Sequence, residues 1–228
     1  YRAELLELNN RYKEALDIYY TLSSTAKELQ KWDLFVSIQI SIARVMETIN
    51  RGDDCLRHLK MAKEYIDHKQ LLNLYAFYSV RMSSYQRIFN SKDSAYFYAQ
   101  QAVDYGIKYN APRQIADGYY LLGILTSNID TSYYLLQQSY KQFLLNKNYN
   151  GATSMAKNIQ NKIKNTKFSN QSLSWLDTVS KYIVLIKENN YTYHYLLNKN
   201  YEEISDQYFF KNNLDSAYYY LKLSKEHM

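Results

Sequence analysis

Residues 93–102 read Asp-Ser-Ala-Tyr-Phe-Tyr-Ala-Gln-Gln-Ala, and variants of this segment recur at residues 130–139 and 215–224. In each copy a small residue is followed four positions later by a larger or apolar one and three positions after that by another small one. Spacings of four and three place such residues on one face of a helix. Small side chains on that face, such as Ala95 and Ala102, allow a second helix to approach closely.

Each copy begins with an aspartate that follows a polar turn. Aspartate is favoured at the residue that precedes a helix, because its carboxylate accepts a hydrogen bond from an unpaired N–H of the first turn. The sequence therefore predicts three helix N-caps, at Asp93, Asp130 and Asp215.

The small residue that opens each pattern recurs along the chain, at Ala15, Cys55, Ala95, Ser132 and Ala217. The steps between them are 40, 40, 37 and 85 residues, and the last step is about two ordinary ones. A constant step of this kind indicates stacked structural repeats. We expect one diverged repeat at residues 149–188, with Trp175, Leu176 and Val179 on its second helix.

The scarcity of glycine (5) and proline (1) argues against an all-β sandwich or barrel, which needs many tight turns. The only proline, Pro112, stands where a repeat should begin and fits the first turn of a helix. We predict a single all-α domain over residues 1–228, made of about six helical hairpins. Their expected ranges are 1–30, 33–67, 70–109, 112–146, 149–188 and 190–227.

The chain resembles the tetratricopeptide repeat (TPR) family. Residues 10–16, Asn-Arg-Tyr-Lys-Glu-Ala-Leu, match the turn and the start of the second helix of that repeat, and residues 50–55 are similar. The resemblance implies a right-handed α-α superhelix that binds a peptide or protein on its concave side. The chain departs from the family pattern in its longer step, since the standard repeat has about 34 residues. The consensus tryptophan and proline are also mostly missing.

Long, tyrosine-rich repeats of this style resemble the sensor regions that precede a histidine kinase or a helix-turn-helix domain in bacterial signalling proteins. The first residue is Tyr1 rather than methionine, and Met228 falls inside an expected helix. We therefore expect a fragment of a longer protein that acts as a sensory or regulatory module. A stand-alone TPR adaptor or signalling-peptide receptor is the alternative.

Motifs for catalysis, metal binding or cofactor binding are not found in the sequence. The glycine-rich phosphate loops, HExxH, GxSxG and CxxC are all missing. Cys55 and His58 are only two ligands and do not make a zinc site. The longest strongly apolar run, residues 182–186, is too short to span a bilayer. We predict no enzyme activity, no metal, no cofactor and no membrane span.

The first helix of each TPR pair lines the concave side of the stack. If the family register holds, the residues on this side include Arg44, Glu47, Arg87, Asp117 and Asp206. The two arginines could grip a carboxylate or a peptide backbone through their guanidinium groups. The competing interpretation is that these five residues are exposed charges that only keep the protein soluble.

Nearly all of the net charge of +6 lies in residues 131–176, which contain six lysines and no acidic residue. The lysines that lie closest together are Lys157, Lys162, Lys164 and Lys167. A basic surface of this kind could meet nucleic acid, anionic lipid or an acidic partner. Because the stretch contains no arginine, we favour protein docking over direct nucleic-acid binding. A solvated, lysine-rich hairpin without a partner is the other interpretation.

Overall fold

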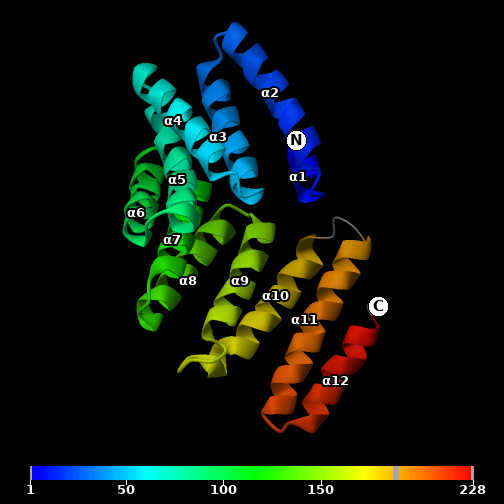
Figure 1. Ribbon diagram of the computed structural model, residues 1–228. Coiled ribbons are helices and arrows are strands. Elements are labelled where there is room, and N and C mark those ends of the chain that lie inside the picture. The colour runs from blue at the N-terminus through cyan, green and yellow to red at the C-terminus, as the bar shows by residue number, and fades with distance from the viewer. Residues whose placement is uncertain (1, 187–189, 227–228) are drawn as a thin grey trace. The chain divides into compact units, whose positions relative to one another are not determined.

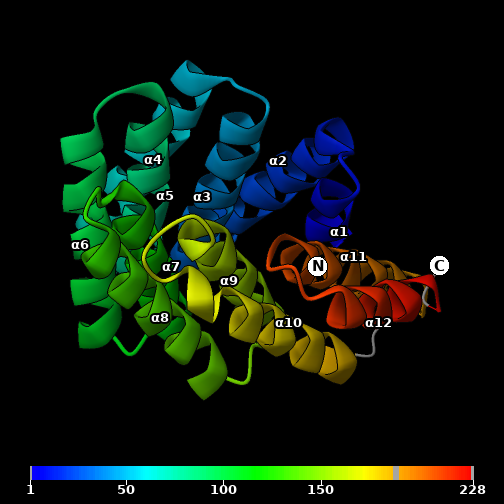
Figure 2. The ribbon, with the colours of Figure 1, turned by 90° about the horizontal axis from the view of Figure 1, so that it is seen from below.

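The computed structural model describes residues 2–186 and 190–226, which form helices and turns without any strand. The chain divides into two compact units, Tyr1–Leu125 (unit 1) and Thr126–Met228 (unit 2). Within each unit, helices that follow one another in the sequence lie side by side (Figure 1, Figure 2). The all-α, helical-repeat fold expected from the sequence is therefore confirmed. The grouping of all residues into a single domain stays a prediction.

Unit 1 contains seven α-helices in its described residues. They are α1 (Arg2–Leu8), α2 (Tyr12–Glu28), α3 (Trp32–Thr48), α4 (Gly52–His68), α5 (Tyr75–Phe89), α6 (Lys92–Lys108) and α7 (Pro112–Leu125). We call α1, α3, α5 and α7 the first helices of their repeats. Pro112 opens α7, in agreement with the prediction. In the hairpin expected at residues 70–109, a 3-10 helix at Leu72–Leu74 precedes α5.

The turns of unit 1 explain its 40-residue repeat. Asn10, Gln30, Asn50 and Gln70 all have positive φ angles, between 53° and 59°. Each residue ends a helix in the left-handed conformation, and the next N–H bonds to a carbonyl five residues back, as Arg11 does to Leu6 at 2.8 Å. One helix with its turn thus occupies 20 residues, and a pair occupies 40.

The predicted small residues do mark the close contacts between helices. Ala15, Cys55 and Ala95 have no solvent-exposed surface. Between α6 and α7 the approach is closer still, because a Cβ atom on Gly118 would lie 2.7 Å from Val103 Cγ2. The second helices therefore pack on their neighbours through the face that the sequence pattern identified.

The predicted aspartate caps are wrong by two residues. The side chain that accepts the capping hydrogen bond belongs to Ser91 for α6. In unit 2 it belongs to Asn128 for α8 (Ile129–Leu145) and to Asn213 for α12 (Leu214–Lys225). Serine and asparagine cap helices as well as aspartate does, so the earlier residue takes the position. The aspartates instead lie inside the first turn, where a negative charge favours the helix dipole.

Unit 2 contains α8 (Ile129–Leu145), α9 (Tyr149–Ile163), α10 (Ser172–Ile186), α11 (Asn190–Phe210) and α12 (Leu214–Lys225). The diverged repeat is the pair α9–α10. As predicted, its second helix carries Leu176 and Val179, which are buried. Its two helices are joined by residues 164–171, which include the 3-10 helix Ser169–Gln171. This long link replaces the short turn found in unit 1.

Candidate functional site

Ion pairs join the first helices of unit 1. Glu7 of α1 accepts a hydrogen bond from Arg44 Nη2 of α3 at 2.8 Å. Glu47 of α3 faces Arg81 of α5, with 3.3 Å between Oε2 and Nη1. Glu7 and Glu47 are 40 residues apart, so the same position in two consecutive repeats meets an arginine from the next first helix. Together with Asp117 of α7, we call these residues the charged row.

The Glu47–Arg81 pair is the buried part of the charged row, whereas the side chains of Arg44 and Asp117 are 32% and 34% exposed. The side chains of Glu47 and Arg81 are 11% and 15% exposed. The Nε atoms of Arg44 and Arg81 are buried and have no hydrogen-bond partner. A buried N–H group without an acceptor costs free energy, and more so when it carries a charge. The row therefore holds donors that an incoming oxygen acceptor could satisfy.

Asp117 extends the charged row onto α7. Burial raises the pKa of its carboxyl group, while the positive charges of Arg113 and Arg81 act in the opposite direction. The nearest of these cations is not close, since Arg113 Nε lies 4.0 Å from Asp117 Oδ2. Asp117 is thus a partly buried carboxylate with a raised pKa and a loosely held counterion, and groups with perturbed pKa values cluster at functional sites.

A cavity of about 400 Å³ lies beside this row, within unit 1. Its lining comes from α1, the start of α2, α3 and α7, and consists of Glu4, Glu7, Leu8, Tyr12, Arg44, Thr48 and Arg113. This volume is in the usual range for ligand pockets. The cavity offers carboxylates, guanidinium groups and the apolar surfaces of Leu8 and Tyr12. It can therefore contact a ligand that has both charged and apolar groups.

The structure brings three of the five predicted groove residues together. Arg44, Glu47 and Asp117 all belong to the charged row. Arg87 is exposed on α5 outside the row, and Asp206 is exposed on α11 in unit 2, where it lines a different cavity. The assignment of the five residues to one binding groove stays a prediction.

Two members of the row were missed by the sequence argument. The 40-residue step leads from Glu47 back to Glu7 and could have identified it. Arg81 has no such signal, since the residue 40 positions before it is Ser41, which is uncharged. Its role depends on how α5 packs against α3, which the sequence pattern does not contain.

The four predicted basic residues do not form one unpaired surface. Lys157 forms an ion pair with Glu203 of α11, and Lys167 pairs with Asp130 of α8 at 2.6 Å. Lys164 lines the same cavity as Asp206. Lys162 is partly exposed. Acidic residues outside residues 131–176 thus neutralise part of the charge that the linear count assigns to this span.

Cys55 and His58 are both buried on α4. Burial raises the pKa of the Cys55 thiol to about 12, and the nearby Glu47 carboxylate contributes to this rise. His58 Nδ1 lies 2.7 Å from Gln39 Oε1, so its ring takes part in a core hydrogen bond. In the part of the chain that the structure describes, no three His, Cys, Asp or Glu residues are grouped as metal ligands. Nor do the described helices include one that is both long and apolar enough to cross a membrane.

No protein-family model matches the chain, and no curated protein matches it in sequence. Solved structures do match. One is a Signal Transduction ATPase with Numerous Domains (STAND) protein with a tetratricopeptide repeat sensor from Pyrococcus horikoshii, at 12% identity and a TM-score of 0.53. The match covers 98% of this chain and 40% of that one, so this chain spans less than half of that protein.

The chain has a TPR-like fold. Two further solved structures cover nearly all of it at lower TM-scores. They are the C-terminal part of a TPR repeat-containing protein from Cytophaga hutchinsonii (14% identity, 100% of this chain and 98% of that one, TM-score 0.39) and BtubC (BKLC) from P. vanneervenii (15% identity, 99% and 76%, TM-score 0.48). At these identities the likeness concerns the fold alone, and the functional argument must come from the residues of this TPR-like chain.

Proposed function

We propose that this TPR-like chain is a protein-interaction module, and that unit 1 holds a segment of a partner protein against the charged row. The observation that carries the proposal is the incomplete hydrogen bonding of the row beside a cavity. Arg44 and Arg81 each keep a buried Nε–H without an acceptor, and Asp117 lacks a tight counterion. A bound polypeptide would supply the missing groups.

Stability alone does not account for this arrangement. Replacing a buried ion pair by apolar residues of similar size is often neutral or stabilising, because burying charges is costly. In this solenoid the first helices could pack through apolar side chains, as the second helices do through Ala95 and Ala99. Charges at this depth are better explained by a contact that is made with a ligand.

The chemistry of the row and the cavity favours an extended peptide segment. Peptide carbonyl oxygens can accept hydrogen bonds from the guanidinium groups of Arg44 and Arg81. A basic side chain of the ligand can pair with Asp117, and an apolar one can contact Leu8 and Tyr12 in the cavity. Such a segment satisfies both signs of charge at once, as an extended peptide in a groove does.

We further propose that the chain serves as the sensory or regulatory region of a bacterial signalling or transcription-regulating protein, acting by binding rather than by catalysis. The STAND protein from P. horikoshii, whose description names a TPR sensor, supports this role. Repeats that contact only their neighbours can change curvature together. A ligand that contacts several first helices would favour one curvature by its difference in affinity for the two.

The test is a selection of peptides from a displayed random library against the full chain. The key variant is Glu47→Gln combined with Arg81→Met, which removes both partners and leaves no buried unpaired charge. The matched control is Arg87→Met, which changes an exposed arginine on the same helix. We expect enriched peptides to bind the control like the natural chain and to bind the double variant at least about tenfold more weakly. Equal binding to both variants, or a library that yields no binders, would refute the proposal.

A further inference from the structure

Unit 2 contains a second cavity, of about 430 Å³, between the ends of α9 and α11. Lys164 follows the last turn of α9, while Asp206 and Phe210 belong to the last turns of α11. Glu203, Gln207 and Lys211 also line the cavity. The volume is within the usual range for small-molecule pockets. With Asn165 and Ser169, the lining combines two lysines, two carboxylates, two amides, a hydroxyl group and an aromatic ring.

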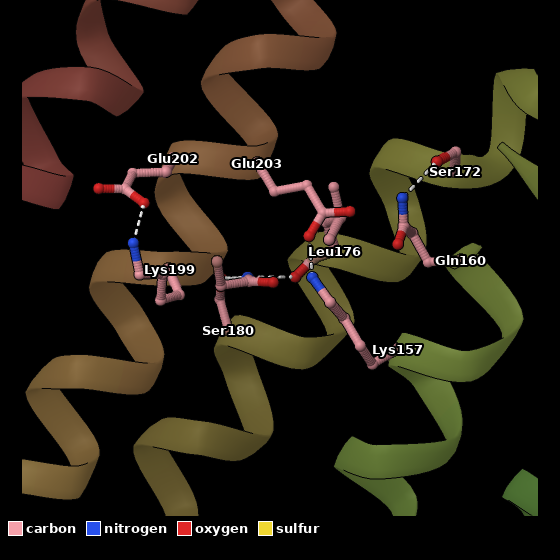
Figure 3. A network of polar contacts seen from close by, with 9 residues as sticks. Lys157, Gln160, Ser172, Leu176, Ser180, Lys199, Glu202 and Glu203 are labelled. Carbon is pink, nitrogen blue, oxygen red and sulfur yellow. Dashed lines mark hydrogen bonds and ion pairs between the residues drawn. The ribbon is translucent and has the colours of Figure 1, made fainter.

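One wall of this cavity is held in place by a polar network across three helices (Figure 3). Glu203 of α11 accepts a hydrogen bond from Lys157 of α9. Asn200, one turn earlier on α11, donates to the backbone oxygen of Leu176 at 2.9 Å and to Ser180 Oγ at 2.7 Å. These bonds fix α11 against α9 and α10, so the side chains that α11 directs toward the cavity start from a rigid backbone.

Several groups around the cavity have no partner of their own. Gln207 Nε2 is buried and makes no hydrogen bond. No ion pair among the described residues involves Lys164, Asp206 or Lys211. These two cations and one anion nevertheless line the same cavity. Phe210 is 84% exposed. A buried amide N–H without an acceptor is costly in the absence of a ligand, which points to an oxygen acceptor that binds here.

We propose that this cavity binds a small zwitterion of the amino-acid class, of the size of an amino acid or a dipeptide. Its carboxylate accepts hydrogen bonds from Gln207 Nε2 and pairs with Lys164 and Lys211. Its ammonium group pairs with Asp206. An apolar side chain of the ligand covers the face of Phe210, where contact with an aromatic ring is favourable.

The set of charges selects a zwitterion over a simple anion or cation. A plain anion would leave Asp206 facing it without compensation, and a plain cation would face Lys164 and Lys211. Only a molecule that carries both charges a few ångströms apart complements all three residues. This site lies in unit 2 and takes a small molecule, so it is independent of the peptide-binding row proposed for unit 1.

The test is calorimetric titration of the full chain with three probes: the dipeptide Ala-Phe, its N-acetylated form and its C-terminal amide. We expect saturable binding of Ala-Phe at one site, and binding at least about tenfold weaker for each blocked form, since each lacks one charge. Asp206→Asn should weaken Ala-Phe but leave the N-acetylated form unchanged. Lys211→Ala should weaken Ala-Phe but leave the amide unchanged.

Asp215→Asn and Lys222→Ala are matched controls, because they remove exposed charges of α12 outside the cavity. Both should bind Ala-Phe like the natural chain. The proposal is overturned if Ala-Phe shows no saturation in the millimolar range. It is equally overturned if the blocked forms bind as well as the zwitterion, or if Asp206→Asn and Lys211→Ala have no more effect than the controls.

Discussion

Unit 1 and unit 2 are built from the same kind of helix pair, but only unit 1 repeats it at a constant interval. In unit 1 a left-handed turn residue occurs every 20 positions from Asn10 to Gln70. In unit 2 the turns at Lys147 and Asn212 have this conformation, while residues 164–171 make a longer link. A constant interval places Glu7 and Glu47 at the same position of two consecutive first helices. Their partners Arg44 and Arg81 are only 37 residues apart, so the second pairing depends on how α5 packs against α3.

The two units also differ in how deeply they bury their charges. The Glu47 and Arg81 side chains of unit 1 are 11% and 15% exposed, whereas Glu203 and Lys157 of unit 2 are 25% and 35% exposed. Water screens the pair in unit 2 more strongly, so it contributes less to stability and is less costly to break. The same architecture thus supports a buried charged row in one unit and a hydrated pair beside a small cavity in the other.

Breaking one ion pair in each unit should give the largest difference between them. Arg81→Met leaves Glu47 buried without a partner, and we expect unit 1 to lose about 3–5 kcal/mol of stability. Lys157→Met leaves a hydrated carboxylate, and we expect unit 2 to lose less than about 1 kcal/mol.

Chemical denaturation can follow the two units separately, because each contains one tryptophan, Trp32 in unit 1 and Trp175 in unit 2. The fluorescence of the Trp175→Phe background then reports unit 1, and that of Trp32→Phe reports unit 2. Similar losses in the two units would contradict the difference in burial described above.

Adding one methyl group at a close helix contact should give an intermediate effect. A Cβ atom at Gly118 would meet backbone atoms of α6, with Val103 N at 3.1 Å and Ala99 O at 3.2 Å, and these cannot move independently. At Gly151 of unit 2 the nearest atoms belong to the buried side chain of Phe143, including Cγ at 2.8 Å, so the whole side chain must shift. We expect Gly118→Ala to cost about 1–3 kcal/mol, because the backbone of α6 cannot yield, and Gly151→Ala to cost less, because a side chain can. Thermal unfolding of the two variants distinguishes them, and a larger loss for Gly151→Ala would show that the α6–α7 contact is not tight.

The smallest expected effect is a pH dependence confined to unit 1. Burial lowers the pKa of His58, whose Nε2 atom is buried without a partner. The unfolded chain binds a proton near pH 6.5, but the folded chain does so only at lower pH. The stability of unit 1 should therefore fall as the pH drops below about 6.5 and level off below the folded pKa. Denaturation between pH 5 and pH 8 tests this, and the His58→Gln variant should lack this part of the pH dependence.

The repeat and its helices could be predicted from the sequence because their signals are local. Ala15, Cys55 and Ala95 mark the close face of the second helices, and their 40-residue step is a property of the turns between them. The N-caps were misplaced for an equally local reason. Asp93 is a good capping residue, but Ser91 is one too, and the sequence pattern does not decide between them.

The candidate sites could be predicted only in part, because their partners come from distant repeats. Arg44, Glu47 and Asp117 were identified from the helix register, whereas Arg81 became visible only through its contact with Glu47. Lys157 was assigned to an unpaired basic surface because its partner, Glu203, is 46 residues away. Which charged residues of two helices form an ion pair depends on how the helices pack. The spacing of residues along the sequence does not contain this information.

Hydrogen–deuterium exchange of the full chain, with and without a peptide selected from the displayed library, tests the central claim most directly. If the peptide lies along the charged row, amide protection should increase in α1, α3, α5 and α7. It should change little in α4, α6 and the part of α2 beyond its first turn. Protection confined to these second helices, or to unit 2, would contradict the assignment of the binding face to the first helices of unit 1.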